Sequence, residues 1–109
     1  MDKIEMILSE IVKFRNERDW EQFHNSKDLA LAISIEAAEL NELFLWKSAE
    51  EVDIEKLKNE LADVFTFSLL LAHKHNLDIK DIISDKLKSN ALKYPVDKAK
   101  GTAKKYNEF

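Results

Sequence analysis

The chain has 109 residues with no cysteine, 45% hydrophobic and 35% charged residues, and a formal net charge of −4. The missing cysteines exclude a disulfide-stapled scaffold and a thiolate metal site, and the length suits one domain, spanning residues 1–109, with a modest core. A single Gly and a single Pro provide too little turn chemistry for an all-β or α/β chain, so the composition predicts an all-α fold.

Four helices are predicted in chain order. The first covers residues 3–18, with Asp2 and Glu5 at capping-box spacing. The second begins at a cap on Asn25 or Ser26 and runs to about Trp46, and the third runs from a cap at Asp53 to about residue 75. A fourth, about residues 79–92, follows a break at residues 76–78 and ends before the residue that precedes the proline. The tail after it is expected to be an ordered loop or arm, and four helices with short connections predict a four-helix-bundle-like domain.

Four carboxylates, two on each of the middle helices, lie on faces that are otherwise apolar. They are Glu36 and Glu39 on one helix and Glu60 and Asp63 on the other. The i,i+3 spacing places each pair one turn apart on one face, so an antiparallel pair of helices brings four carboxylates to a shared centre. Acidic pairs at this spacing are also common on solvated faces, and it is the apolar surroundings that favour a buried site for a hard divalent cation.

Aromatic side chains gather in the loop before the second helix and at its end. Trp20, Phe23, His24, Phe44 and Trp46 are suited to a stacking slot for a nucleobase, because rings bury a large area and stack on any π face. A hydrophobic lid over one end of the bundle explains the same residues equally well.

The charge is unevenly distributed along the chain. Seven lysines and one aspartate stand between Lys86 and Lys105, so the remainder is strongly acidic. An acidic protein is a poor general binder of nucleic acid, and a smaller phosphate-bearing ligand suits both halves better. No apolar run reaches membrane-spanning length and no signal-peptide pattern is present, so no membrane partner is expected and a cytoplasmic protein is the simplest inference.

Several sequence blocks resemble a known family. The Glu36–Glu39 and Glu60–Asp63 blocks are similar to the ExxE and ExxD motifs of MazG-like all-α nucleoside triphosphate pyrophosphohydrolases. Three longer blocks, residues 18–24, 39–47 and 94–106, resemble the dCTP pyrophosphatase branch of that family.

The resemblance implies a site and a ligand. Glu36, Glu39, Glu60 and Asp63 would carry catalysis by ligating Mg²⁺, with Mn²⁺ able to substitute. The residues implied in substrate binding are Trp20, His24, Trp46, Lys47, Phe67, Asn90, Lys93, Tyr94 and Lys104. Phe67 departs from the family pattern, in which a tyrosine stands, so one hydroxyl contact to sugar or phosphate is lost.

The implied reaction is Mg²⁺-dependent hydrolysis of a nucleoside triphosphate, dCTP or a modified dCTP, to the monophosphate and pyrophosphate, by water attack at the α-phosphorus. The nearly all-round apolar stretch at residues 64–72 and the resemblance both indicate a homodimer or homotetramer.

Two other classes of protein remain open. A non-catalytic helical interaction module would carry solvated acids and would pack its aromatics on a partner. A carboxylate-bridged di-metal oxidoreductase would need Glu-x-x-His on two helices, and only Glu21 to His24 has that spacing.

Overall fold

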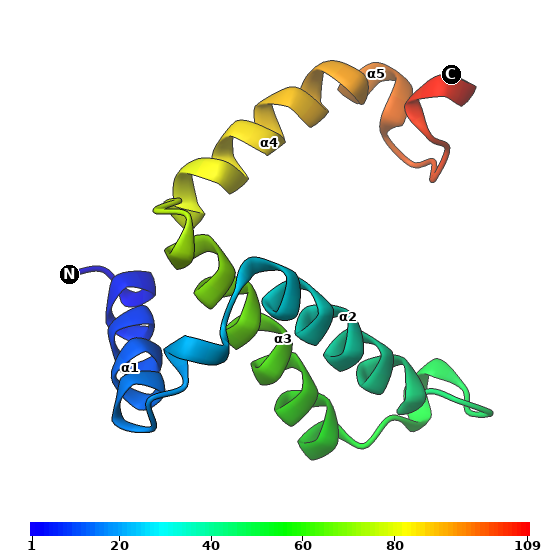
Figure 1. Ribbon diagram of the computed structural model, residues 1–109. Coiled ribbons are helices and arrows are strands. Elements are labelled where there is room, and N and C mark those ends of the chain that lie inside the picture. The colour runs from blue at the N-terminus through cyan, green and yellow to red at the C-terminus, as the bar shows by residue number, and fades with distance from the viewer. The chain divides into compact units, whose positions relative to one another are not determined.

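The computed structural model describes residues 1–109, which form helices and turns without any strand, so the all-α prediction is confirmed (Figure 1). The chain divides into two compact units, residues 1–76 and residues 77–109, and each is described by itself. Neither unit contains a helix long and apolar enough to cross a bilayer.

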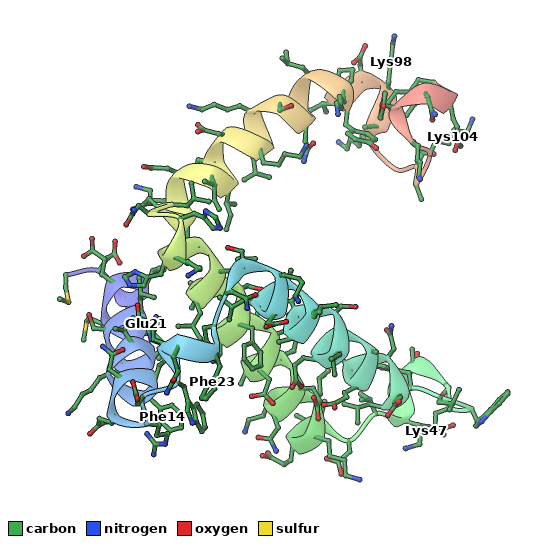
Figure 2. All side chains as sticks on the ribbon, viewed as in Figure 1. Phe14, Glu21, Phe23, Lys47, Lys98 and Lys104 are labelled. Atoms are coloured by element: carbon green, nitrogen blue, oxygen red, sulfur yellow. The ribbon has the colours of Figure 1, made fainter.

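The first helix, α1 (Lys3–Glu17), begins with the predicted capping box. The Glu5 backbone N–H donates to Asp2 Oδ1 at 2.8 Å, and the Asp2 N–H donates to Glu5 Oε2 at 3.1 Å, which satisfies two of the free donors at the helix start. After the C-cap Arg18, a short 3₁₀ turn, η1 (Glu21–Phe23), leads to the next helix. Figure 2 shows Phe14, Glu21 and Phe23 near this connection.

The next two helices, α2 (Ser26–Glu42) and α3 (Ile54–Lys74), lie side by side as an antiparallel hairpin (Figure 1). Asn25 Oδ1 accepts from the Asp28 N–H at 2.8 Å, and Asp53 Oδ1 accepts from the Glu55 N–H at 3.0 Å. Both caps agree with the sequence, because an Asn or Asp side chain replaces the missing acceptor at a helix start.

The predicted extension of α2 to Trp46 is wrong, because the helix ends at Glu42. The backbone N–H groups of residues 43, 44, 45 and 47 instead donate to the carbonyl three positions earlier, which makes tighter turns than those of an α-helix. Trp46 then takes a left-handed backbone with φ of 61°, and the connection passes through a second 3₁₀ turn, η2 (Ala49–Glu51), before α3 begins.

The core of the first unit is small. Leu29 on α2 and Leu70 and Ala72 on α3 are the only buried hydrophobic residues. Leu31, Ile35 and Phe65, on the same two helices, remain 53%, 57% and 62% exposed. The hairpin therefore leaves apolar surface that the first unit by itself does not cover.

The second unit contains α4 (Ile79–Lys93), the one-turn helix α5 (Val96–Ala99) and a 3₁₀ turn, η3 (Tyr106–Glu108). Asp78 caps α4, and the helix ends one residue later than predicted, just before Tyr94 and the proline. The Tyr94 ring makes edge contacts with Tyr106 and Phe109, at centroid separations of 6.0 and 5.9 Å, so the tail is an ordered arm as expected. Packing of α4 with the other three helices stays a prediction.

Candidate functional site

The α2–α3 hairpin brings carboxylates from its two helices together. Glu36 on α2 and Glu60 and Asp63 on α3 each offer one oxygen, and these three atoms lie within 4.8 Å of one another. Glu36 and Glu60 are half-buried between the helices, whereas Asp63 is exposed at the edge. The antiparallel arrangement thus brings together three of the four carboxylates that the spacing places at a shared centre.

Two oxygens of this centre have no partner. Glu36 Oε2 and Glu60 Oε2 are both sealed from solvent, and neither accepts a hydrogen bond from the protein. Burial, together with the neighbouring carboxyls of Glu39 and Asp63, raises the pKa of Glu36 to about 7. Burial and the charge of Glu39 likewise raise the pKa of Glu60. Holding these groups ionised without a counter-charge is therefore unfavourable.

A hard divalent cation fits this donor set. The ligands are carboxylate oxygens only, they carry excess negative charge, and two of the oxygens are desolvated without a donor. Mg²⁺ and Mn²⁺ prefer oxygen ligands of this kind, and a bound cation replaces both the missing hydrogen bonds and the missing positive charge. No histidine belongs to the cluster, which argues against the ligand set of a di-iron oxidoreductase.

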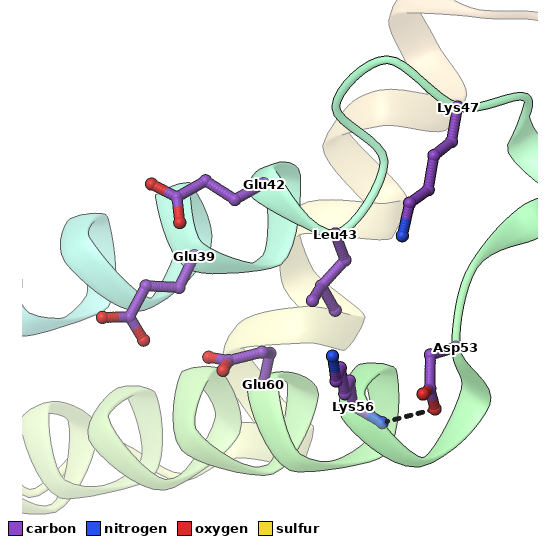
Figure 3. Close-up of a pocket in the computed structure, with 7 residues that line it drawn as sticks. All are labelled: Glu39, Glu42, Leu43, Lys47, Asp53, Lys56 and Glu60. Carbon is purple, nitrogen blue, oxygen red and sulfur yellow. Dashed lines mark hydrogen bonds between the residues drawn. The ribbon is translucent and has the colours of Figure 1, made fainter.

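Glu39 lies at one side of the centre. It lines a cavity of about 390 Å³ together with Glu60, between the end of α2 and the start of α3 (Figure 3). Glu39 and Asp63 are exposed, because a two-helix hairpin covers only one face of each helix and these two side chains flank that face. The Asp63 carboxylate still converges on the centre with Glu36 and Glu60.

Two lysines share this cavity with the acids. Lys47 follows the end of α2, Lys56 stands one turn before Glu60 on α3, and neither makes an ion pair within the chain. Figure 3 shows both side chains directed into the space between the two helices. Sequence reasoning included Lys47 but missed Lys56, although its i−4 spacing from Glu60 places it on the ligand face.

The aromatic residues expected around a base are only partly brought together. The rings of His24 and Phe67 meet edge to face with centroids 6.5 Å apart, and Trp20 packs on Phe14 at 5.9 Å. Burial, followed by the charge of Arg15, lowers the pKa of His24.

Trp46 stands apart from this group. It follows the far end of α2, whose 17 residues span roughly 25 Å, and it is 93% exposed. One chain therefore does not bring Trp46 to Trp20 and His24. The same exposure shows that Trp46 is not a lid packed on its own chain.

Four further predicted substrate residues lie in the second unit. The Asn90 carbonyl accepts from the Tyr94 N–H at 2.8 Å, and the Lys93 Nζ lies 5.0 Å from the centroid of the Tyr106 ring. Lys104 is exposed in the arm, where its N–H donates to Thr102. Their contacts with a substrate stay a prediction.

Comparisons with known proteins agree with this geometry. Residues 31–109 match the MazG-like family. The chain is 38% identical to mouse dCTP pyrophosphatase 1 and 36% identical to the human protein of that name, in alignments 105 positions long that cover 89% of this chain and 62% of each relative. It thus spans about 62% of the length of these curated relatives.

A solved structure is similar along most of its own length. A pyrophosphatase from Archaeoglobus fulgidus superimposes with a TM-score of 0.79 at 33% identity, covering 87% of this chain and 94% of that one. Taken with the acidic hairpin and the matched residues, these similarities show that the chain belongs to the MazG-like family.

Proposed function

We propose that this protein is a Mg²⁺-dependent nucleoside triphosphate pyrophosphohydrolase that acts on dCTP or a modified dCTP and serves to control or clean the nucleotide pool. The observation that carries the proposal is the pair of sealed, partnerless oxygens of Glu36 and Glu60 beside Asp63. Relatives named dCTP pyrophosphatase and a similar structure named pyrophosphatase support the reaction class.

Four residues would hold the metal. Glu36, Glu60 and Asp63 provide converging oxygens, and Glu39 lies beside Glu60 on the wall of the adjoining cavity. The chemistry that Mg²⁺ supplies when bound is neutralisation of phosphate charge and Lewis-acid activation of water.

The reaction breaks one phosphoanhydride bond. A water oxygen forms a bond to the α-phosphorus, and the bond from that phosphorus to the α,β-bridging oxygen breaks, so pyrophosphate leaves and the monophosphate remains. The water gives up a proton, which one of the four carboxylates is suited to accept.

The two cavity lysines are suited to the polyphosphate tail. Lys47 and Lys56 provide unpaired positive charge next to Glu39 and Glu60, and the 390 Å³ cavity has room for the phosphates beyond the bond that is cleaved. They orient the leaving group by attraction to its charge.

A complete base site requires a second copy of the chain. Trp20 and His24 lie at the start of α2 and Trp46 follows its end, so a slot containing all three must combine two chains in a homodimer or homotetramer. The exposed Leu31, Ile35 and Phe65 provide apolar surface for such an assembly.

The test is a product analysis with Mg²⁺ against a panel of dNTPs and NTPs, separated by anion exchange. We expect dCTP to yield dCMP and pyrophosphate, with orthophosphate appearing only after an inorganic pyrophosphatase is added. Direct formation of dCDP and orthophosphate would rule out attack at the α-phosphorus. An absence of turnover with every nucleotide would favour a non-catalytic interaction module instead.

A further inference from the structure

A second cavity lies in the first unit, away from the carboxylate centre. It has a volume of about 200 Å³ and is bordered by the end of α1, by η1 and by α2 and α3. Leu29 and Leu70 form apolar walls, and Arg15, Glu21 and Lys74 provide charged groups. None of the acids of the carboxylate centre lines it.

Arg15 is the buried charge of this cavity. The residue is only 8% exposed, yet its guanidinium is incompletely paired. Nε and Nη2 both donate to the same oxygen, Asn16 Oδ1, at 3.1 and 2.9 Å, and Nη1 donates to no acceptor in the protein. A guanidinium has five N–H donors, so most of its hydrogen-bonding capacity is unused. Nη1 is not among the atoms sealed from solvent, so its unused donors are open to a ligand in the cavity that Arg15 lines.

The one carboxylate nearby does not complete the pairing. Glu21 Oε2 lies 3.5 Å from Arg15 Nη2, longer than the roughly 2.8 Å of a charge-assisted hydrogen bond. The Glu21 side chain is 67% exposed, so water screens the ion pair and the side chain is free to move.

The balance of charge around the cavity is positive. Lys74 makes no ion pair within the chain, so the buried cation of Arg15 and the exposed cation of Lys74 face one largely solvated carboxylate. His24 also lines the cavity, and its Nδ1 is buried without a hydrogen-bond partner. Unused N–H donors and excess positive charge match an oxyanion, whereas a cation would be repelled and an apolar ligand would leave the donors unpaired.

The volume restricts the size of the ligand. About 200 Å³ corresponds to roughly seven water molecules, and it is below the roughly 300 Å³ at which pockets for drug-sized molecules begin. We propose that this cavity is a binding site for a small phosphate-class oxyanion, inorganic phosphate or pyrophosphate, separate from the carboxylate centre. Arg15 and Lys74 are its binding residues, and Glu21 competes with the ligand for Arg15.

The experiment is isothermal titration of the intact protein in EDTA at constant ionic strength, with inorganic phosphate in one arm and pyrophosphate in the other. Excluding metal removes the cation that would bind phosphate at the carboxylate centre, and the variants below separate this cavity from Lys47 and Lys56. We expect saturable binding in at least one arm, and the arm with the higher affinity identifies the ligand. Arg15→Gln should weaken binding about tenfold or more, because charge-assisted hydrogen bonds to a buried group are lost.

Two further variants separate binding from a purely structural role. Lys74→Gln should weaken binding about threefold, and Glu21→Gln should tighten it by a similar factor because a competing carboxylate is removed. Lys58→Gln is the matched control and should change nothing, since Lys58 pairs with Glu55 at 3.2 Å outside the cavity. If Arg15→Gln does not fold, judged by circular dichroism, the Lys74 and Glu21 variants decide.

Two results would overturn the proposal. One is an absence of saturable binding of either anion to the wild-type protein up to about 10 mM, the weak end of ordinary affinities. The other is an affinity that neither Lys74→Gln nor Glu21→Gln alters. Neither result bears on nucleotide hydrolysis, which is measured separately with Mg²⁺.

Discussion

Replacing Glu36 with Gln should stabilise the metal-free protein at alkaline pH. The pKa of Glu36 is raised from 4.5 to about 7, so the folded protein holds this proton more tightly than the unfolded chain does. The stabilisation from that proton is fully present below pH 4.5 and is lost as the pH rises through 7. Glutamine keeps the size of the side chain and removes the charge, so the variant avoids this loss.

The size of the effect follows from the same shift. A rise in pKa from 4.5 to about 7 corresponds to at most roughly 3 kcal/mol. Glu36 is only half-buried, and screening by water reduces the expected gain to about 1 kcal/mol at pH 8. At pH 4 the folded wild type is already neutral at this position, so wild type and variant should have nearly equal free energies of unfolding.

Urea unfolding followed by circular dichroism, in EDTA and at a fixed protein concentration, measures the free energies of unfolding of wild type and variant at pH 4 and at pH 8. Glu10→Gln, an exposed and unpaired acid on α1, is the matched control and should change neither. Mg²⁺ at a hundredfold excess over its dissociation constant should add about 2.7 kcal/mol to wild type and clearly less to the Glu36 variant. A variant that is less stable than wild type by the same amount at pH 4 and pH 8, with no Mg²⁺ effect on wild type, would refute the reasoning and make Glu36 a structural acceptor.

Three further predictions concern activity. Asp63→Asn should abolish dCTP hydrolysis with an unchanged circular dichroism spectrum, and retained turnover would remove Asp63 from the metal ligands. Lys56→Gln should raise KM for dCTP about threefold in steady-state kinetics, with little change in kcat. Lys56→Arg should return KM to the wild-type value, and the control Lys58→Gln should leave both constants unchanged. Trp46→Ala should weaken binding of a non-hydrolysable nucleotide by roughly 1 to 3 kcal/mol for every base, measured by fluorescence titration. Mixed oligomers of Trp46→Ala and Asp63→Asn chains should regain part of the turnover, which would not happen if each site were built from a single chain.

The helix starts were predictable because their chemistry is local. Asp2, Asn25 and Asp53 each accept a backbone N–H from two or three residues ahead, so a short stretch of sequence contains all the information that the cap needs. The end of α2 was not predictable in this way. No glycine or proline occurs in residues 43–48, directly after the helix ends at Glu42. The change to tighter turns that ends at Trp46 therefore has no sequence signal.

The sequence predicted the carboxylate centre as far as the pairing of the two helices that carry it. Spacing alone placed Glu36 and Glu60 on facing surfaces, but it did not give the exposure of Glu39 and Asp63, which depends on how far each helix is covered. The burial of Arg15 was missed for a related reason. Its surroundings include Glu21 and Lys74, from a turn and from a distant helix, and periodicity within α1 does not contain that contact.

The α2–α3 hairpin also has a consequence for how the protein folds. All four acids of the candidate centre belong to consecutive helices, so they meet as soon as the α2–α3 hairpin closes. Closing this hairpin brings like charges together before the rest of the chain can compensate for their repulsion. Such repulsion would slow folding of the metal-free chain and make Mg²⁺ an accelerator of refolding as well as a ligand of the folded protein.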